Sequence, residues 1–569
     1  MSQCRRLFSL MLFCAACSSP AGTAKSTTPD VADIAADVSA PADVVVPDTA
    51  PSDVPAADIP TVPQLCTDGG WPVRAFATGP YGTHRHDIAA DFTLPLSDGS
   101  DWHFADKFTG CETYVFVPDL LSVSELDKTS IWEKDLDLLI QRSPRNAHYF
   151  FVSQQSADKA QASIDAMTAR VMDLLSNLSP EDGQFWHDHL HVVAKRAQDV
   201  KDWPGAVLLG HGQIGFGIDR YQRIRGFGML ADVTRQDAAL QAAGKWPWKS
   251  NLAYAANEPL QYNGDALRED ARASDGALVV PLWKGETLEE FAETDVTLTT
   301  ALDTYDTLEI EVEMRCPNAD APEPGNCGAW DYIASLAVRG DDGNNIEIAR
   351  FITSYHRETH WFVDASPMLV YLKNGGTKHF RWDSAPSWNK QPTSTFLSLR
   401  FLNKKKGVMP KQVVKLWDGG AFTSAYDTLH PDRTVDIPAG AKTVEIWALI
   451  TGHGGDATTH CSEFCNHVHR FTVGGQDFEK KHPEAGTSNL CMPNLDKGMV
   501  PNQGGTWWYG RGGWCPGMQV DPWRVDITAK VQPGKTATLS YHGLLAGKTP
   551  PDGDGTANID GAVWLVVYE

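Results

Sequence analysis

The chain has 569 residues and a formal net charge of -23, because 72 acidic side chains outnumber 49 lysines and arginines. Binding to nucleic acid needs a basic face that displaces counterions from phosphates, so this charge argues against nucleic-acid partners. About 500 residues follow the N-terminal segments described next, which is enough for three domains of ordinary size.

Residues 1–17 have the pattern of an export signal, with a basic start, the apolar run 7–13 and small residues before Cys17. The apolar run is too short to span a bilayer as a helix. The pattern resembles that of bacterial lipoproteins, whose lipidated residue would be Cys17, except that Cys14 stands where they have leucine or a similar residue. We expect an exported lipoprotein of the bacterial outer membrane or cell surface, attached by its lipid anchor alone, with plain secretion as the alternative.

Residues 18–64 consist mainly of Ala, Pro, Val and Asp, and Lys25 is their only basic residue. This segment has too little apolar bulk to offset the entropy of ordering, so we expect a disordered, self-repelling tether. Its expected role is to hold the rest of the chain at a distance from a surface.

Eight cysteines remain when Cys4 and Cys14 are removed with the signal and Cys17 is lipidated. In an exported chain, an even number of cysteines predicts disulfides rather than metal ligands, because an oxidising compartment lets the bonds persist. Sequence alone does not fix the connectivity. Our pairing is Cys66–Cys111, Cys316–Cys327, Cys461–Cys465 and Cys491–Cys515.

Residues 65–275 are predicted to form an α/β domain. The short apolar runs 114–117 and 149–152 are typical of buried strands, whereas apolar residues recur at helical spacing from Ile164 to Leu178. This alternation of strand and helix favours a sheet with crossover helices.

Segments 91–99, 108–117 and 217–225 resemble the opening and closing strands of a thioredoxin-like domain of the peroxiredoxin type. The redox chemistry of that family needs a cysteine after the first core strand, where a helix N-terminus lowers the thiol pKa. Residues 118–121 are Pro-Asp-Leu-Leu instead. We therefore expect a redox-inactive accessory domain, which disfavours a redox function for the lipoprotein.

Three histidines, His187, His189 and His191, lie close together in this domain. We expect them on a helix, where only the first and the third share a face. That arrangement favours a solvated helix surface over a metal site.

The periodicity changes at about residue 285. Apolar side chains at every second position of 308–314 alternate with glutamates, a pattern typical of a half-buried strand. Similar runs continue to the C-terminus, divided by Gly, Pro and Asn. This part is predicted to be all β and to form two antiparallel sandwiches, at residues 285–407 and 408–569.

Five motifs occur in the order and spacing of the peptide-N-glycosidase F family, which the region of about 290–569 resembles. They lie at residues 315–318, 327–332, 348–355, 461–465 and 513–518. The resemblance implies two consecutive jelly-roll sandwiches, so the predicted fold class is mainly β, preceded by the α/β domain and the tether.

Members of that family hydrolyse the amide between an asparagine side chain and the first N-acetylglucosamine of an N-glycan, without a metal or cofactor. The resemblance thus implies a peptide-N4-(N-acetyl-beta-glucosaminyl)asparagine amidase acting on N-glycosylated proteins or peptides, and we expect a monomer. An unactivated amide needs a base to prepare water, a donor to stabilise the developing oxyanion, and exclusion of bulk solvent. Carboxylates at the seam of two sandwiches would supply the proton transfers.

The resemblance assigns three catalytic carboxylates. Asp331 corresponds to the family's essential aspartate, as the base acting on water or the group contacting the first sugar. Glu463 corresponds to the essential glutamate, which bridges through water to the amide or activates it. Asp383 is the best match to a third carboxylate, which is a glutamate in the family.

The resemblance also implies substrate-binding residues. Arg511 would orient substrate or Glu463, and Trp514 would belong to a sugar-facing wall in a Gly-rich loop with Trp507 and Trp508. Trp382 would replace a family tryptophan that is Ala385 here. The implied set is Trp330, Trp382, Arg511, Trp514 and His453.

A second class of function, a non-catalytic N-glycan-binding (lectin-like) lipoprotein, stays open. A binder would show Tyr332, which stands where the family has arginine, His453, in a Thr-Gly-His segment where the family has Trp-Gly-His, and Asp383 in place of a glutamate. Without the resemblance, Asp331 would be a turn residue and Glu463 part of a disulfide staple.

A zinc site from His460, His467 and His469 is the remaining alternative. We disfavour it because we expect Cys461 and Cys465 to form a disulfide with each other and so not to bind a metal. The predicted site therefore contains no metal.

Overall fold

The computed structural model describes residues 64–119, 131–132, 136–210, 215–227, 255–298, 302–323, 325–454, 462–486, 491–503, 514–553 and 556–569. The predicted signal with Cys17, all but the last residue of the predicted tether, and the predicted site residue Arg511 lie outside the described residues. Within those ranges, none of the helices combines the length and the apolar sequence that crossing a bilayer requires.

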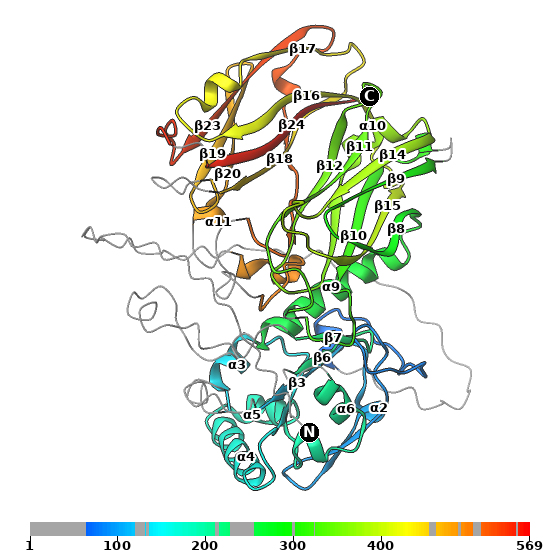
Figure 1. Cartoon of the computed structure of the whole chain (residues 1–569), viewed down its shortest axis with the longest axis vertical. Helices are drawn as coiled ribbons and strands as arrows, with labels where there is room; N and C mark the ends of the chain where they lie inside the picture. Colours follow the sequence, from blue (N-terminus) through cyan, green and yellow to red (C-terminus); the bar gives the residue numbers. More distant parts are fainter. Residues whose placement is uncertain are drawn as a thin grey trace, which may run out of the picture. The chain divides into compact units, whose positions relative to one another are not determined.

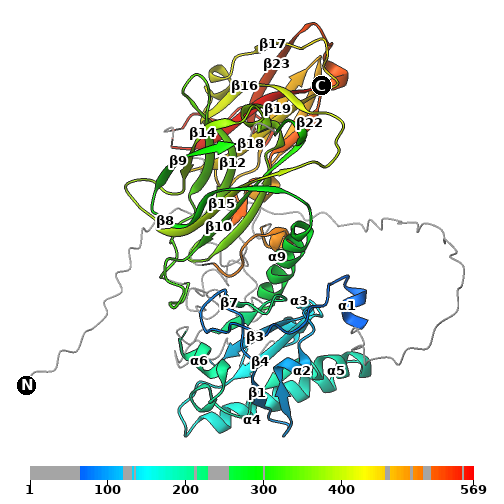
Figure 2. The same cartoon turned by 90° about the vertical axis from the view of Figure 1, so that its right-hand side faces the viewer.

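The N-terminal α/β part is built on a five-stranded sheet with strand order β5-β4-β3-β6-β7 (Figures 1 and 2). β3, β4 and β5 run parallel, β6 pairs antiparallel with β3, and β7 pairs antiparallel with β6. The strands are β3 (Thr113–Pro118), β4 (Ala147–Val152), β5 (Leu190–Val192), β6 (Phe216–Ile218) and β7 (Ile224–Gly226). The other elements are α1 (Gln64–Asp68), the hairpin of β1 (Thr93–Pro95) and β2 (Asp101–His103), α2 (Phe104–Lys107), α3 (Leu136–Arg142), α4 (Ala160–Ser176), α5 (Pro180–His187), α6 (Trp203–Gly210) and α9 (Asn257–Ala273).

Both faces of this sheet are covered, because every residue of β3 and β4 is buried. Val115 and Tyr149 pack into one apolar core, whereas their neighbours Tyr114 and Phe150 pack into another. Successive side chains of a strand point to opposite faces, so the two cores lie on the two sides of the sheet. The predicted alternation of strand and helix is confirmed, and the thioredoxin-like relationship stays a prediction.

The prediction of one helix across His187, His189 and His191 is wrong. α5 ends at His187, and His191 lies on β5, opposite Phe150 of β4. Leu190 and Val192 pack into the same core as α4 and α5. Pairing in the sheet therefore outweighs the helical spacing of the histidines.

The first sandwich consists of two antiparallel sheets, with strand orders β13-β10-β15-β8 and β21-β12-β11-β14-β9. The alternation predicted for 308–314 is confirmed, since Leu308, Ile310 and Val312 are fully buried in β10. The strands are β8 (Leu278–Leu288), β9 (Phe291–Leu298), β10 (Thr307–Arg315), β11 (Ile333–Arg339), β12 (Asn345–Ile352), β13 (Thr359–Asp364), β14 (Gly376–Asp383), β15 (Thr393–Leu402) and β21 (Met518–Gln519).

The second sandwich consists of two sheets with strand orders β16-β24-β18-β22 and β17-β23-β19-β20. Its strands are β16 (Pro410–Ala421), β17 (Arg433–Asp436), β18 (Thr443–His453), β19 (His467–Val473), β20 (Gln476–Lys481), β22 (Trp523–Asp526), β23 (Thr536–Leu545) and β24 (Asn558–Tyr568). β21 lies in the same C-terminal part of the sequence, but it pairs with β12 and so belongs to a sheet of the first sandwich. Trp447 and Trp564 of the second sandwich also belong to the core of the first.

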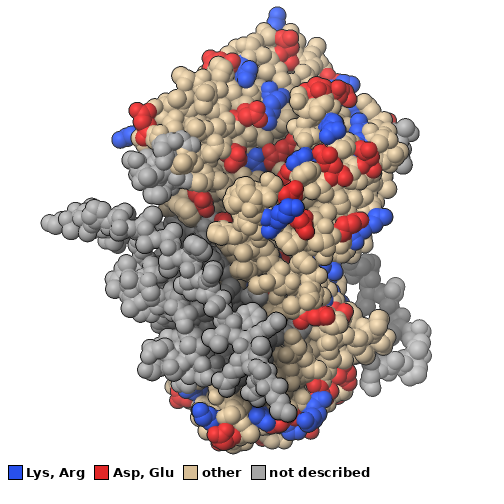
Figure 3. Space-filling model, in the orientation of Figure 1, with Lys and Arg blue, Asp and Glu red and all other residues tan. Residues whose placement is uncertain are grey.

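Three of the four predicted disulfides are present, namely Cys66–Cys111, Cys316–Cys327 and Cys491–Cys515. Cys461 lies outside the described residues, so its pairing with Cys465 stays a prediction. On the described part of the face drawn in Figure 3, acidic and basic side chains are interspersed, without a large patch of one sign.

Candidate functional site

Asp331 lies in the short connection between the Cys316–Cys327 disulfide and β11. The backbone N–H of Tyr332 donates to Oγ1 of Thr353 at 2.7 Å, and that hydroxyl donates to the carbonyl of Trp330 at 2.7 Å. The backbone N–H of Thr353 donates to the carbonyl of Tyr332 at 2.9 Å. Three hydrogen bonds to one residue at the end of β12 thus hold both neighbours of Asp331.

The carboxylate of Asp331 is half-buried and accepts a 2.5 Å hydrogen bond from the hydroxyl of Tyr355. Tyr355 itself is held from the C-terminal part of the chain, because its backbone N–H donates to Oε1 of Gln503 at 2.9 Å. The side chain of Gln503 is fully buried and donates to the carbonyls of Val500 and Pro516, each at 2.7 Å. The loop closed by Cys491–Cys515 therefore supports Asp331 through Gln503 and Tyr355.

The buried guanidinium of Arg357 also holds the turn that carries Tyr355. Nη1 of Arg357 donates to Glu258 of α9 at 3.0 Å and to the carbonyl of Pro501 at 2.5 Å, and Nε pairs with Glu323. Burial opposes the charge, but Glu258 and Glu323 raise the pKa of Arg357 above its ordinary value. Arg357 thus connects the turn that carries Tyr355 to α9, to the loop closed by Cys316–Cys327 and to the loop before Gln503.

Glu463 is held through its neighbour Ser462, which is fully buried. The hydroxyl of Ser462 donates to the carbonyl of His453 at 2.7 Å, and its own carbonyl accepts from Nε1 of Trp514 at 3.2 Å and from Nε2 of His467 at 2.8 Å. A Cβ on Gly452 would lie 2.0 Å from that carbonyl oxygen, so this close approach requires glycine. The half-buried Glu463 follows directly from this fixed point.

The two carboxylate-bearing segments meet at the seam between the sandwiches. Trp514 packs with Ile333 and Ile352 of the first sandwich while its ring nitrogen bonds Ser462. Next to it, Arg350 of β12 donates to Oγ1 of Thr451 in β18 at 3.0 Å and to a backbone carbonyl of β24 at 2.5 Å. Glu347 pairs with this buried arginine and raises its pKa against the effect of burial.

The predicted aromatic residues separate into exposed and buried ones. Trp330 is 51% exposed beside Asp331, which fits a sugar-contacting role. The expectation for Trp382 is wrong, because its side chain is 0% exposed in the core of the first sandwich. Trp514 is 8% exposed and packs against His467 and His482, so it supports Ser462 and does not form an open sugar-facing wall.

The remaining predicted residues differ in how well the structure describes them. His453 is half-buried at the end of β18 and receives the Ser462 hydroxyl on its carbonyl. Arg511, Trp507, Trp508 and His460 lie outside the described residues. Their roles stay predictions.

Asp383 is the last residue of β14 and its side chain is 40% exposed. Both of its carboxylate oxygens accept from Arg381, at 2.8 and 2.7 Å. This two-point pair lies on the outer face of the strand, where ion pairs are common and contribute little. The geometry favours a surface role for Asp383, and its catalytic assignment stays a prediction.

Sequence reasoning missed several residues around Asp331. Tyr355 closes one of the family motifs, but nothing in its spacing points to Asp331. Trp388 is 79% exposed and makes an edge contact with Tyr332, whose hydroxyl accepts from Asn389 at 2.6 Å. Trp330, Tyr332 and Trp388 thus present aromatic surface beside the candidate base.

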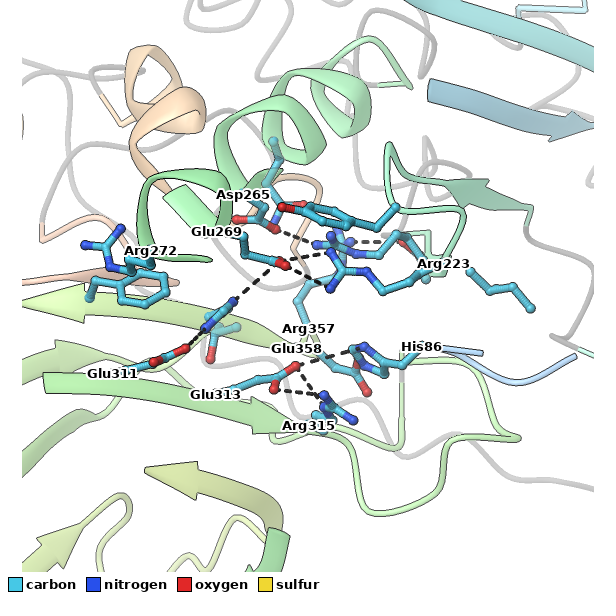
Figure 4. A pocket seen from close by; sticks show the side chains of 18 of the residues that line it. His86, Arg223, Asp265, Glu269, Arg272, Glu311, Glu313, Arg315, Arg357 and Glu358 are labelled. Carbon is cyan, nitrogen blue, oxygen red and sulfur yellow. Dashed lines mark hydrogen bonds and ion pairs between the residues drawn. The ribbon is translucent and has the colours of Figure 1, made fainter. Parts of the chain in front are cut away.

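A separate cavity of about 360 Å³ lies between α9, β7 and strands β10 and β13 (Figure 4). Its charged side chains face one another, as in the pairs Arg223–Glu269 at 2.9 Å, His86–Glu358 at 2.7 Å and Arg315–Glu313 at 2.8 Å. A substrate would have to displace these pairs. We therefore interpret the ion pairs around this cavity as contacts that hold these elements of the fold together.

Comparison with known proteins points to one family. Residues 422–567 match the family model described as Peptide-N-glycosidase F, C terminal. Peptide-N(4)-(N-acetyl-beta-D-glucosaminyl)asparagine amidase F of Elizabethkingia miricola is 24% identical over 273 residues, which are 45% of this chain and 73% of that protein.

Two solved structures are similar as well. PNGase F, a glycosylasparaginase from Flavobacterium meningosepticum, is 17% identical with a TM-score of 0.42, covering 52% of this chain and 96% of that one. PNGF-II is 12% identical with a TM-score of 0.38, covering 53% of this chain and 67% of that one.

Proposed function

Because the C-terminal half of this chain is related to the peptide-N-glycosidase F family, as its motifs predicted, we propose that the protein hydrolyses the asparagine-N-acetylglucosamine amide of N-glycoproteins or N-glycopeptides. Water attacks the side-chain carbonyl carbon of asparagine, the carbon-nitrogen bond breaks and the nitrogen takes up a proton. The products are an aspartate in the peptide and a glycosylamine, which then loses ammonia.

Asp331 is the base that takes a proton from the attacking water, or the group that holds the first sugar. The observation that carries the proposal is its 2.5 Å hydrogen bond from Tyr355. A base of this kind must be held within hydrogen-bond reach of its proton, and a displacement of about 1 Å can cost about a hundredfold in rate. The bonds from Tyr355 and around Thr353 supply that fixed position.

Glu463 acts on the amide from the second sandwich, directly or through one water molecule. Its position follows from Ser462, whose carbonyl receives Trp514 and His467. Trp330 and Trp388 offer exposed ring faces for the sugars, since apolar sugar faces stack on aromatic rings. Arg511 orients the substrate or Glu463.

Export as a lipid-anchored monomer belongs to the same proposal. N-glycosylated proteins are met outside the cytoplasm, and disulfides such as Cys316–Cys327 and Cys491–Cys515 persist in an oxidising compartment. Cys17 would carry the lipid and residues 18–64 would act as the tether.

A lectin-like role is the second candidate, and two observations favour it. Arg381 occupies both carboxylate oxygens of Asp383, and Tyr332 stands where the family has arginine. A protein with these features would bind N-glycans at Trp330 and Trp388 without cleaving them.

Incubation of a denatured N-glycopeptide with the protein lacking residues 1–64 separates the two functions. Amide hydrolysis leaves a deglycosylated peptide about one mass unit heavier than the asparagine form, because aspartate replaces asparagine. Intact glycopeptide that binds the protein supports the lectin-like role. An unbound, intact glycopeptide contradicts both candidates.

A further inference from the structure

The α/β part holds a cluster of metal-ligating side chains that the proposed function does not use. Glu112 lies just before β3, His148 lies on β4 and His189 lies just before β5. These three strands are parallel neighbours, so the three residues meet at the edge where the strands begin. Each side chain is at least nine-tenths buried, with relative exposures of 9%, 8% and 10% for Glu112, His148 and His189.

The spacing of the ligand atoms fits one small cation. Nε2 of His148 lies 3.2 Å and Nε2 of His189 lies 3.5 Å from the same oxygen of Glu112, and the three ligand atoms lie within 4.8 Å of one another. Ligands about 2.0–2.1 Å from a tetrahedral zinc ion are about 3.3 Å apart. The two separations from Glu112 are close to that value. The rings of His148 and His189 are stacked with centroids 4.4 Å apart, so both must turn about their side-chain bonds to direct their lone pairs at one ion.

The second hydrogen-bonding atom of each residue is held by the protein. Nδ1 of His189 donates to the carbonyl of Phe185 at 2.7 Å, which leaves Nε2 as a lone pair directed at Glu112. Nδ1 of His148 bonds Nε2 of His191 at 3.1 Å, and the other oxygen of Glu112 accepts from Thr109 at 2.8 Å. Such outer contacts, which orient the ligands, are typical of metal sites.

The hydrogen bonding of Nε2 of His189 is incomplete if the cluster is only an ion pair. This atom is buried and, apart from its 3.5 Å approach to Glu112, has no hydrogen-bond partner among the described residues. A buried polar atom without a full hydrogen bond destabilises the fold. A cation between His189, His148 and Glu112 would satisfy it.

One side of the cluster is open to a cavity of about 480 Å³. The cavity wall is polar and includes Asp98, Asp101, Lys107 and Asp188. A metal with three protein ligands keeps a fourth position for water or another small ligand, and this opening provides it. Two imidazoles with one carboxylate suit zinc and similar transition metals, whereas calcium and magnesium prefer oxygen ligands.

We propose that Glu112, His148 and His189 bind one divalent transition-metal ion, with zinc as the occupant, and that the fourth position faces the cavity. His191 and Thr109 are positioning residues for His148 and Glu112. The site is separate from Asp331 and Glu463, and amide hydrolysis does not depend on it. The proposed ligand set includes only His189 of the three neighbouring histidines His187, His189 and His191.

The test uses untagged protein lacking residues 1–64, freed of metal with a chelator and titrated with Zn²⁺ and Co²⁺. We expect one ion per chain by elemental analysis, and visible Co²⁺ absorption of the intensity typical of four- or five-coordinate sites. E112Q and H189Q should each weaken binding by at least about a hundredfold. H187Q is the matched control, because the His187 side chain is 58% exposed and lies outside the ligand set.

Circular dichroism and thermal unfolding of the metal-free variants check their folding. If a variant does not fold, the Co²⁺ spectrum of the unaltered chain decides whether the metal site is present. Stoichiometric binding that E112Q or H189Q abolishes and H187Q retains supports the site. Absence of stoichiometric binding, equal binding by all variants, or a weak octahedral Co²⁺ spectrum overturns it.

Discussion

The hydroxyl of Tyr355 donates a 2.5 Å hydrogen bond to Oδ1 of Asp331, across 24 residues of sequence. The ring of Tyr355 packs beside the Cys491–Cys515 disulfide, and its backbone is held by Gln503. The orientation of the candidate base in the first sandwich therefore depends on a loop that belongs to the C-terminal part of the chain.

Replacement of Tyr355 by phenylalanine should lower kcat about tenfold and change KM little. The ring keeps its packing, but the carboxylate of Asp331 loses a hydrogen bond to a charged group, worth about 1.5–3 kcal/mol at most. Steady-state kinetics on an N-glycopeptide measure the effect. A raised KM with unchanged kcat would assign Tyr355 to substrate binding instead.

Trp514→Phe and Trp382→Phe form a matched pair of buried tryptophan substitutions. Trp514→Phe removes the N–H that holds the carbonyl of Ser462, so we expect a fall in kcat of about tenfold through Glu463. Trp382→Phe leaves a small cavity in the core and should lower stability by about 1–3 kcal/mol with near-normal kcat. Equal losses of activity in two equally stable variants would contradict these separate roles.

Asp383→Asn tests whether a third carboxylate takes part in the reaction. Because Arg381 already occupies both oxygens of Asp383 on an exposed face, we expect kcat/KM within about threefold of that of the unaltered protein. Lys390→Gln, which breaks another exposed ion pair with Glu289, provides the reference for a purely surface effect. A loss as large as that of Asp331→Asn would make Asp383 catalytic.

Acid should destabilise the second sandwich through two buried histidines. Burial and the adjacent His482 and His467 hold the pKa of His469 well below its ordinary value, and burial together with Lys480 does the same for His482. The unfolded chain takes up protons below about pH 6.5 that these folded histidines do not. The free energy of unfolding should thus be unaffected above that pH and fall below it, by at most about 1.4 kcal/mol per pH unit and histidine.

Chemical denaturation at a series of pH values measures this dependence. His482→Gln should flatten the fall below pH about 6.5, because the variant lacks one of the two buried histidines. An identical slope in the His482→Gln variant would show that this histidine does not cause the acid sensitivity.

Local patterns were enough to predict much of the fold. The period-two run in β10 and the buried runs in β3 and β4 are present. Three of the paired disulfides are present as well, although the local sequence did not fix their connectivity. The burial of Trp382 was also accessible from the sequence. It shares a strand face with Phe380, two residues away, whereas Asp383 shares the opposite face with Arg381.

The contacts that position the candidate site could not be predicted in this way. Gln503 supports Tyr355 across 148 residues, and Arg357 reaches Glu258 across 99. The metal-ligating cluster has the same origin, since His148 and Glu112 are 36 residues apart and meet only because β3 and β4 pair in parallel. Such long-range contacts depend on how distant segments pack together and leave no periodic signal in the sequence.

The most direct test of the proposed amidase is hydrolysis of an N-glycopeptide in water enriched in oxygen-18, followed by mass spectrometry. Attack of water on the amide carbon predicts one heavy oxygen in the new aspartate, a gain of about three mass units over the asparagine form, and no product with folded Asp331→Asn protein. An intact glycopeptide, or equal product with Asp331→Asn, would contradict the proposed role of Asp331.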